Sequence, residues 1–322
     1  MSKNNKFSVG GLFSGVGGIE KGFQNAGFEI SWANEYDKYA CKTYRINHPK
    51  HNLIEKNIYE LSPKKLKPVD VLVGGFPCQA FSIAGYRKGF KDPRGNLFYE
   101  IARFIDELST KPKALMLENV KNLSGHDRGK TRMAIEKILH DFGYYVHWQV
   151  YNTCDYTNIP QNRERTIIIC FKNKKSYSYF LQHPIKKQSN LKPIARMLEE
   201  KKIDERYYYF QESQYYQMFK KQIKNPNTLY QLRRIYVREN KNHLCPTLTA
   251  NMGTGGHNVP LLLDDVGIRK LTPKECFNFQ GFNTIFFPKD VTNTQLYKQA
   301  GNSVTIPLIK NIALNIKASI SN

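Results

Sequence analysis

One cysteine of this sequence stands where a protein could use it as a nucleophile. Cys78 lies in the segment GGFPCQAFS at 74–82, in which Gly75 and Pro77 sharply end the apolar run VDVLVG at 69–74. The thiolate is the reactive form of cysteine, and a thiol with a pKa of about 8.5 is mostly protonated near pH 7. A nucleophilic Cys78 would therefore need nearby positive charge or proton transfer during its attack. The alternative is a small buried cysteine that only fills space.

Acidic and basic side chains border two other apolar runs. Glu118 opens the tripeptide ENV at the end of ALMLE, 114–118, and the segment PQNRER at 160–165 leads into TIIICF, 166–171. By themselves, Arg163 and Arg165 would normally belong to a solvated run of charges. Together with a thiol, however, a hydrogen-bonding acid and cationic donors for a carbonyl oxygen suit a reaction on a polar heterocycle.

A glycine-rich turn, LFSGVGG at 12–18, indicates a cofactor site. Glycines let the backbone approach a ligand closely, and the following helix offers free N–H groups at its start. Glu35 follows about 20 positions later, where an acidic side chain can accept hydrogen bonds from ribose hydroxyls. The combination predicts an adenosine-containing cofactor, either a dinucleotide or S-adenosylmethionine. A glycine turn alone is a weak signal, because strand-to-helix turns also use glycine for steric reasons.

Alternating strands and helices must position these residues. We predict strands at 6–13, 29–34, 69–74, 114–118, 145–151 and 166–171, and helices at 17–26, 37–47, 97–108, 131–142, 271–279 and 304–316. This alternation predicts an α/β fold with a parallel sheet and helices on both faces. Ligands of such folds bind at the carboxyl ends of the strands. The glycine turn and Cys78 each follow a predicted strand, and Glu118 ends one.

Charge points to a polyanionic partner. The 322 residues include 49 Lys and Arg against 27 Asp and Glu, a net charge of +22. Nucleic acid is the commonest partner of a protein this basic, although a generally lysine-rich proteome would give the same balance.

The cysteine spacing and the lengths of the apolar runs indicate the cellular compartment of the protein. The six cysteines, at 41, 78, 154, 170, 245 and 276, form no C-x-x-C pair and have no histidine at zinc-ligand spacing, so we expect no metal. There is no run with the length of a signal-peptide core or of the roughly 20 apolar residues of a membrane span. We expect a soluble protein of the reducing cytoplasm that does not contact a membrane.

Eight segments in this order resemble the bacterial DNA (cytosine-5)-methyltransferases of the HhaI and HaeIII type. The segments are LFSGVGG, ANEYDKY, GGFPCQAFS, GNLF, ENV, PQNRER, RKLTPKEC and QAGNSV. The resemblance covers about 7–171 and 269–316, and the proline–cysteine motif with ENV and Q-x-R-x-R is highly specific. It implies a Rossmann-like, S-adenosylmethionine-dependent methyltransferase sheet with a smaller target-recognition domain.

The resemblance also implies the catalytic roles. Cys78 would add to C6 of a cytosine flipped out of the duplex, C5 would accept the methyl group, and loss of the C5 proton and the thiolate would restore the ring. Glu118 would contact N3 and the exocyclic amine. Arg165 would hold the O2 edge, and Arg163 would support the site.

The implied cofactor is S-adenosylmethionine, which would leave as S-adenosylhomocysteine. Phe13 would lie on the adenine face, Glu35 at the ribose, and the QAGNSV residues near the carboxylate. The full implied set is Phe13, Gly15, Gly17, Glu35, Tyr36, Asn57, Ile58, Pro77, Leu97, Asn302 and Ser303.

Three positions depart from the family pattern. Gly11 stands where members commonly have Asp, so one polar contact near the cofactor is missing or comes from elsewhere. Asn57 replaces an Asp that usually meets the adenine amine, and its side chain still offers an acceptor oxygen. Ala84 replaces a polar residue that some members place in the loop that enters the DNA.

The resemblance divides the chain into a catalytic domain at 1–183 and 268–322 and a target-recognition domain at 184–267. The segment 83–94 resembles the mobile loop that closes over DNA, although a solvated basic loop would look similar. Each basic side chain could equally contact only phosphate. The candidate DNA-binding residues are Arg87, Lys88, Arg94, Arg233, Arg234, Arg238, Thr247 and Thr249.

The expected partner is double-stranded DNA, with a cognate restriction endonuclease acting on the same site, and the chain is expected to be a monomer. Three other functions fit parts of the pattern. An RNA cytosine-5 methyltransferase would use the same motifs, and a catalytically silent DNA-binding regulator would keep only the binding surface. A nicotinamide or flavin oxidoreductase would explain the glycine turn alone.

Overall fold

The computed structural model describes residues 6–76, 97–188, 190–233, 235–254 and 258–322. Within these ranges the chain forms two compact units. The first comprises residues up to 151 together with 164–186 and 307–322, and the second comprises 152–163 and 187–306. The second unit therefore includes segments on both sides of 184–267. The assignment of 184–267 as a target-recognition domain stays a prediction, because packing alone does not show what a segment binds.

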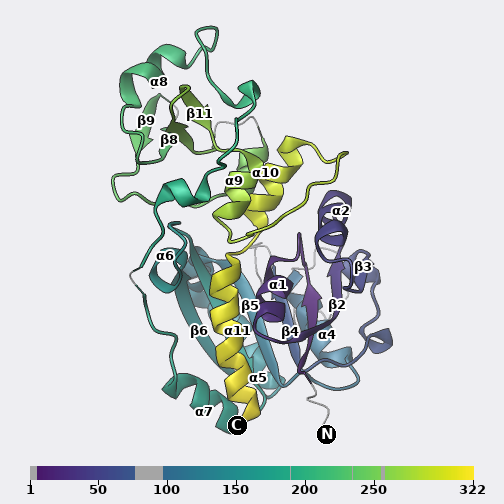
Figure 1. Cartoon of the computed structure of the whole chain (residues 1–322). Helices are drawn as coiled ribbons and strands as arrows, with labels where there is room; N and C mark the ends of the chain where they lie inside the picture. Colours follow the sequence, from purple (N-terminus) through teal and green to yellow (C-terminus); the bar gives the residue numbers. More distant parts are fainter. Residues whose placement is uncertain (1–5, 77–96, 189, 234, 255–257) are drawn as a thin grey trace, which may run out of the picture. The chain divides into compact units, whose positions relative to one another are not determined.

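The first unit is built on a seven-stranded sheet with the order β3-β2-β1-β4-β5-β7-β6 (Figure 1). Neighbours from β3 through β5 are parallel. The strands are β1 (Ser8–Leu12), β2 (Glu29–Glu35), β3 (Leu53–Glu55), β4 (Val71–Gly75), β5 (Ala114–Val120), β6 (Tyr145–Asn152) and β7 (Glu164–Phe171). The order reverses direction at β1 and β4, and the crevice at such a switch point is the usual ligand site of an open α/β sheet.

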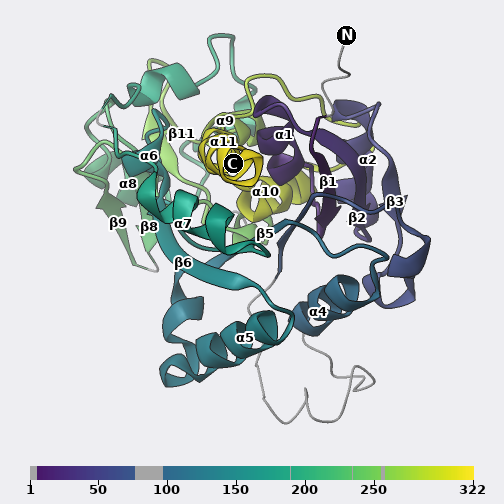
Figure 2. The same cartoon turned by 90° about the horizontal axis from the view of Figure 1, so that it is seen from below.

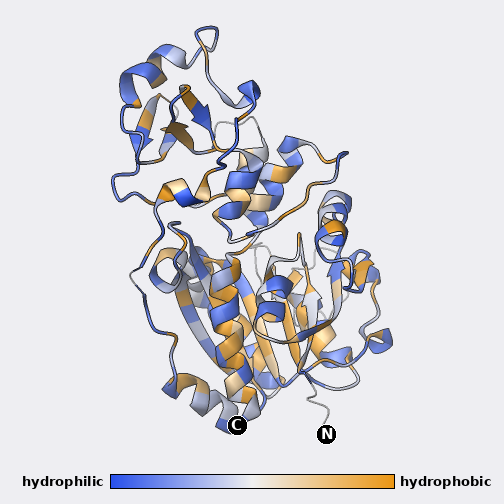
Figure 3. Ribbon diagram, viewed as in Figure 1, coloured by the Kyte–Doolittle hydropathy of each residue, from blue (hydrophilic) through white to orange (hydrophobic). Residues whose placement is uncertain are grey.

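Helices cover both faces of this sheet. The helices are α1 (Gly18–Asn25), α2 (Lys38–Asn47), α4 (Leu97–Glu107), α5 (Lys130–Asp141), α7 (Lys174–Gln182) and α11 (Ile306–Ser321), with short 3-10 turns η1 (Ile58–Glu60), η2 (Pro63–Lys65) and η3 (Lys121–Gly129). Helices α4 and α5 lie on one face, and α1 and α11 lie on the other (Figure 2). The central strands are mostly apolar (Figure 3), as expected for strands buried on both faces.

The α/β fold with a parallel sheet is confirmed from β3 through β5, and β7 is the strand that departs from the parallel direction. β7 runs antiparallel to β5, with Val120 opposite Arg165 and Ala114 opposite Phe171. Strands β6 and β7 are consecutive in the chain and adjacent in the sheet. No long crossover helix separates them, since only the four-residue α6 (Thr153–Tyr156) is helical between them. The chain therefore returns along the sheet in the opposite direction.

The second unit has its own antiparallel sheet with the order β11-β10-β8-β9. Its elements are α6, η4 (Ile194–Met197), η5 (Glu205–Tyr207), α8 (Tyr216–Gln222), β8 (Tyr230–Arg233), β9 (Tyr236–Glu239), η6 (Ala250–Gly253), β10 (Leu261–Leu263), β11 (Ile268–Lys270), α9 (Pro273–Asn278) and α10 (Asn293–Asn302). A small core around Phe219, Tyr230 and Leu261 supports the sheet. No helix in the described ranges is long and apolar enough to cross a membrane.

Close packing at the central strand predicts a stability effect. A Cβ at Gly10 would lie 2.3 Å from the ring of Trp32. We expect Gly10→Ala to lower the free energy of unfolding by about 1–3 kcal/mol, because the buried ring must shift. Gly125→Ala is the matched control, since a Cβ there meets nothing within 4 Å. Thermal unfolding of both variants tests this, and equal midpoints would contradict it.

Candidate active site

The turn after β1 has the backbone geometry of a ligand-binding loop. Phe13 and Gly15 both have φ of 55°, and Gly17 has φ of 85°. A Cβ at Gly15 would meet no atom of the described residues within 4 Å, whereas one at Gly17 would lie 2.5 Å from His48 Nε2. The backbone beside Gly15 therefore borders open space, and Gly17 is required by packing as well as by its φ.

The Glu35 carboxylate holds this turn in place. Its Oε2 accepts a hydrogen bond from the Gly15 N–H at 2.8 Å, and its Oε1 accepts from the N–H groups of Tyr36 and Asp37, both at 2.8 Å. A carboxylate can accept about four hydrogen bonds, so capacity remains for a further donor. The glycine turn and the acidic residue at the end of β2 are thus in direct contact, whereas the predicted role of Glu35 at a ribose stays a prediction.

The other cofactor candidates of the first unit differ in exposure. Phe13 and Leu97 are partly buried against the core, to which the buried Ile58 belongs. Tyr36 is 69% exposed and follows Glu35 directly. Asn57 is exposed, and its side-chain oxygen accepts a hydrogen bond from the Tyr59 N–H at 3.2 Å.

The remaining cofactor candidates lie elsewhere. Asn302 and Ser303 belong to the second unit, where Asn302 is exposed and Ser303 is buried. Pro77 lies outside the described residues.

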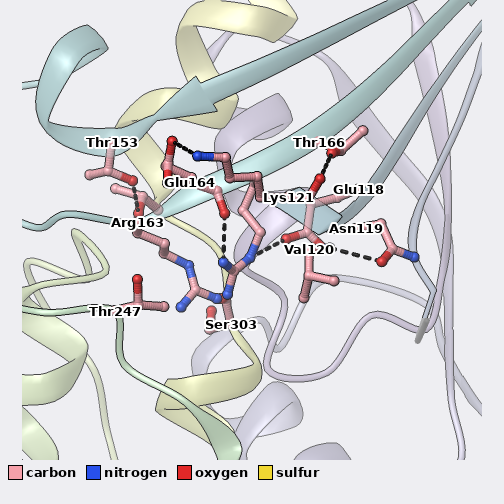
Figure 4. A network of polar contacts seen from close by, with 12 residues as sticks. Glu118, Asn119, Val120, Lys121, Thr153, Arg163, Glu164, Thr166, Thr247 and Ser303 are labelled. Carbon is pink, nitrogen blue, oxygen red and sulfur yellow. Dashed lines mark hydrogen bonds and ion pairs between the residues drawn. The ribbon is translucent and has the colours of Figure 1, made fainter. Parts of the chain in front are cut away.

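Glu118 and Arg165 form an ion pair at the carboxyl edge of the first unit's sheet. Arg165 Nε lies 2.9 Å from Glu118 Oε1, and the two side chains are 14% and 13% exposed. Figure 4 shows Glu118 beside Asn119 and Val120 at the end of β5. The antiparallel direction of β7 explains this contact, because the start of β7 lies beside the end of β5. In a parallel β7, Arg165 would lie at the opposite edge.

The end of β4 makes room for this pair. A Cβ at Gly75 would lie only 3.2 Å from Glu118 Oε2. The Asn119 side-chain amide donates to the Phe76 carbonyl oxygen at 2.7 Å, which ties the end of β5 to the end of β4. Phe76 is the last described residue before the segment that contains Cys78.

Arg163 lies in a different environment from Arg165, although the sequence predicts both for the site. Arg163 is 2% exposed and belongs to the second unit. It donates to the carbonyl oxygens of Leu248 at 2.7 Å, Gly301 at 3.1 Å, and Ser303. A planar guanidinium matches several acceptors at fixed angles. These contacts give Arg163 the geometry of a clamp within the second unit.

Five of the six cysteines are described; all five are buried, and none of them is in a disulfide bond. Burial raises the pKa of Cys41, Cys170, Cys245 and Cys276, which keeps these thiols protonated and unreactive. Cys78 lies outside the described residues. Among the residues that are described, no cluster of His, Cys, Asp or Glu could hold a metal ion.

The candidate DNA-binding residues are only partly described. Arg233 and Arg238 are exposed, and both donate to the Gln231 side-chain oxygen. Thr247 donates to the Asn162 carbonyl oxygen at 2.6 Å, and Thr249 is exposed. The candidates Arg87, Lys88, Arg94 and Arg234 lie outside the described residues.

Sequence reasoning missed one buried acidic residue beside the glycine turn. Glu20 lies in the first turn of α1 and is 1% exposed. Its position three residues after Gly17 gave no signal of burial, because acidic residues are common in a first helical turn and are usually exposed.

The clamp at Arg163 predicts a loss of stability on substitution. Arg163→Met keeps much of the apolar stem but leaves three buried carbonyl oxygens without their donor, which we expect to cost about 3 kcal/mol or more. Arg196→Met, at an exposed position of the same unit, is the control. Thermal unfolding and limited proteolysis of both variants measure the effect. Equal stability would exclude the clamp.

Comparison with known proteins places the chain in a family. The model of the C-5 cytosine-specific DNA methylases matches residues 7–318. The Type II methyltransferase M.Bsp6I of Bacillus sp. (strain RFL6) is 49% identical over 316 residues, covering 97% of this chain and 99% of the relative. M.HhaI of Haemophilus parahaemolyticus is 34% identical over 327 residues, covering 96% and 94%.

Solved structures agree in fold. A crystal structure of a DNMT2 mutant of Spodoptera frugiperda superposes with a TM-score of 0.73 at 19% identity, over 97% of this chain and 100% of that one. With the mixed sheet, the glycine turn and the Glu118–Arg165 pair in place, the extent of these matches leaves one assignment: the chain belongs to the C-5 cytosine-specific DNA methylase family.

Proposed function

We propose that this chain is a DNA (cytosine-5)-methyltransferase that uses S-adenosylmethionine, acts on double-stranded DNA and uses Cys78 as its nucleophile. The observation that carries the proposal is the ion pair between Glu118 and Arg165. It stands at the carboxyl edge of the sheet, next to the end of β4, from which the chain continues toward Cys78.

The residues around the first turn fit the cofactor. The backbone beside Gly15 borders open space, and Glu35 retains hydrogen-bonding capacity after it has fixed the turn. Glu35 would accept from ribose hydroxyls, and Phe13 and the exposed Tyr36 would contact the adenine. Asn57, Ile58, Pro77, Leu97, Asn302 and Ser303 complete the proposed set. When bound, S-adenosylmethionine supplies an electrophilic methyl group and leaves as S-adenosylhomocysteine.

The base is activated by a covalent step. An aromatic C5 is a poor nucleophile, so Cys78 Sγ forms a bond to C6 and the electron pair of the C5–C6 double bond becomes available at C5. C5 takes the methyl group, then loses its proton, and the electrons of that C–H bond expel the thiolate and restore the double bond. The Cys78 thiolate is thus regenerated at the end of the reaction.

Glu118 and Arg165 hold the cytosine during this addition. Glu118 contacts N3 and the exocyclic amine, where a proton at N3 relieves the negative charge that develops on attack at C6. Arg165 donates to O2. Because Arg165 Nε is paired with Glu118 Oε1, the two side chains present a fixed pair of groups to the base. Arg163 acts through the backbone of the second unit.

The reacting carbons are inaccessible inside a duplex, so the cytosine must be flipped out. A net charge of +22 favours binding to DNA phosphates. The segment 184–267 would select the sequence, and the loop at 83–94 would close over the DNA. We further propose a cytoplasmic monomer of a restriction-modification system, with a cognate endonuclease that acts on the same site.

The nucleophile gives a direct test. We expect Cys78→Ala to abolish methyl transfer to duplex DNA and to form no stable adduct with DNA containing 5-fluorocytosine, since that adduct needs the Sγ–C6 bond. Cys154→Ala, at a buried cysteine elsewhere in the chain, should keep both activities. Label from S-adenosylmethionine and denaturing electrophoresis provide the readouts.

The same assay separates the alternatives. Full turnover by Cys78→Ala, or no transfer by the unaltered protein to any cytosine-containing duplex, would refute the proposal. A parallel reaction with tRNA distinguishes an RNA methyltransferase. Bisulfite sequencing of DNA from cells that express the chain reports the modified base together with its target sequence.

The ion pair gives a second test. We expect Glu118→Gln and Arg165→Lys each to lower kcat by about 10²-fold or more, and the double variant to lose much less than the product of the two, because the groups act as one unit. Lys121→Met and Glu164→Gln are matched controls at a nearby ion pair of 2.7 Å whose side chains are 54% and 38% exposed. These should change kcat less than about twofold. Independent effects of Glu118 and Arg165 would contradict their coupling.

A further inference from the structure

Glu20 is a buried carboxylate that the proposed function has not used. It is 1% exposed, and its Oε2 makes no hydrogen bond with any of the described residues. Burial raises the pKa of the carboxyl to about 7, against a small lowering by Ser14 and by its own backbone N–H. A buried charge without a partner is costly, so such a group either stays protonated or receives a partner from outside.

The carboxylate lies directly under the glycine turn. A Cβ added at Gly11 would be 2.1 Å from Glu20 Oε1 and 3.0 Å from Ser14 Oγ. Glu20 therefore fills the side-chain position that Gly11 leaves open at the end of β1. Ser14 Oγ is also buried, and its contact with Glu20 lowers the pKa of the carboxyl. Glu20 Oε2 is thus left without a hydrogen-bond partner among the described residues, beside the end of β1.

An ordinary helix-capping role does not account for this arrangement. Glu20 is in the first turn of α1, where a carboxylate is favoured by the helix dipole. Such residues gain that stabilisation while exposed, and they do not require burial at 1% exposure beneath a neighbouring strand. The Glu35 carboxylate adds repulsion, since it raises the pKa of Glu20 further. Two carboxylates beside one turn favour a cation between them.

We infer that Glu20 is a cofactor-binding residue whose carboxylate pairs with the cationic methionine moiety of S-adenosylmethionine. This inference rests on the proposed function, in which Glu35 binds the ribose. The adenosine part of the cofactor carries no cation at neutral pH. The methionine part carries an ammonium and a sulfonium group, so only this part can relieve the repulsion between the carboxylates. Glu20 would thereby supply the polar contact that Gly11 cannot make.

If Glu20 has this role, its substitution should change the affinity for ligands according to their methionine part. We expect Glu20→Gln, which keeps the shape but removes the charge, to weaken S-adenosylmethionine binding about 10- to 100-fold. Binding of 5′-methylthioadenosine, which lacks the amino-acid part and the positive charge, should change less than about twofold. Calorimetry measures both, and S-adenosylhomocysteine reports whether the ammonium alone accounts for the loss.

Equal losses for all three ligands, or no loss for S-adenosylmethionine, would overturn the inference. Failure of the unaltered protein to bind S-adenosylmethionine would instead refute the proposed function, so the two failures are distinguishable.

Stability without ligand gives an independent readout. Because the pKa of Glu20 is raised in the folded chain, its stabilising contribution is present at low pH and is lost as pH rises through about 7. The groups that face it are Ser14 from the turn, Glu35 from β2 and Tyr44 from α2. We expect the midpoint of Glu20→Gln, relative to the unaltered protein, to rise as the pH increases from about 4.5 to about 7, and to change little above that. No such rise would contradict a raised pKa.

A reciprocal exchange tests the position. Gly11→Asp alone should unfold at a lower temperature, because its Cβ meets Glu20 Oε1. Gly11→Asp combined with Glu20→Ala returns a carboxylate to the same place and should bind S-adenosylmethionine more tightly than Glu20→Ala alone. If the double variant binds no better, the carboxylate at this position is not the contact.

Discussion

The antiparallel pairing of β7 with β5 is the constraint on which the candidate active site depends. In a parallel sheet, the start of one strand lies at the opposite edge from the end of its neighbour. Reversal of β7 brings Arg165 to the edge where β5 delivers Glu118, and the two side chains meet at 2.9 Å. A short connection between β6 and β7 makes this reversal possible. The antiparallel direction of β7 thus places the Arg165 guanidinium beside Glu118 and sets its orientation.

The same edge gathers three carboxylates in three different electrostatic states. Glu35 is fixed by backbone N–H groups, and Glu118 is paired with a guanidinium. Glu20 is buried with one oxygen that has no partner among the described residues. These environments suit different roles. Glu35, held in place by N–H groups, can accept hydrogen bonds from hydroxyl groups, and Glu118, paired with Arg165, is held in one orientation. A buried carboxylate without a partner can respond to a cation.

Two of these carboxylates lie where they do because a neighbouring glycine has no side chain. Gly75 leaves room for Glu118, and Gly11 leaves room for Glu20. The Glu20 carboxylate occupies the place of a side chain at Gly11, and Glu118 packs closely against Gly75. A sequence motif does not reveal such contacts, because the glycine and the carboxylate that meet belong to different elements of the fold.

The sequence by itself determined the strand and helix alternation, the glycine turn with Glu35, and the polar residues at the strand ends, because period and spacing record them locally. Tertiary structure decided the rest. The direction of β7 depends on the length of a connection and on sheet pairing, and the same basic run contains a paired Arg165 and a clamped Arg163. Burial of Glu20 beside Gly11 depends on helix packing. Contacts between distant segments leave no local periodicity, so only the folded chain could reveal them.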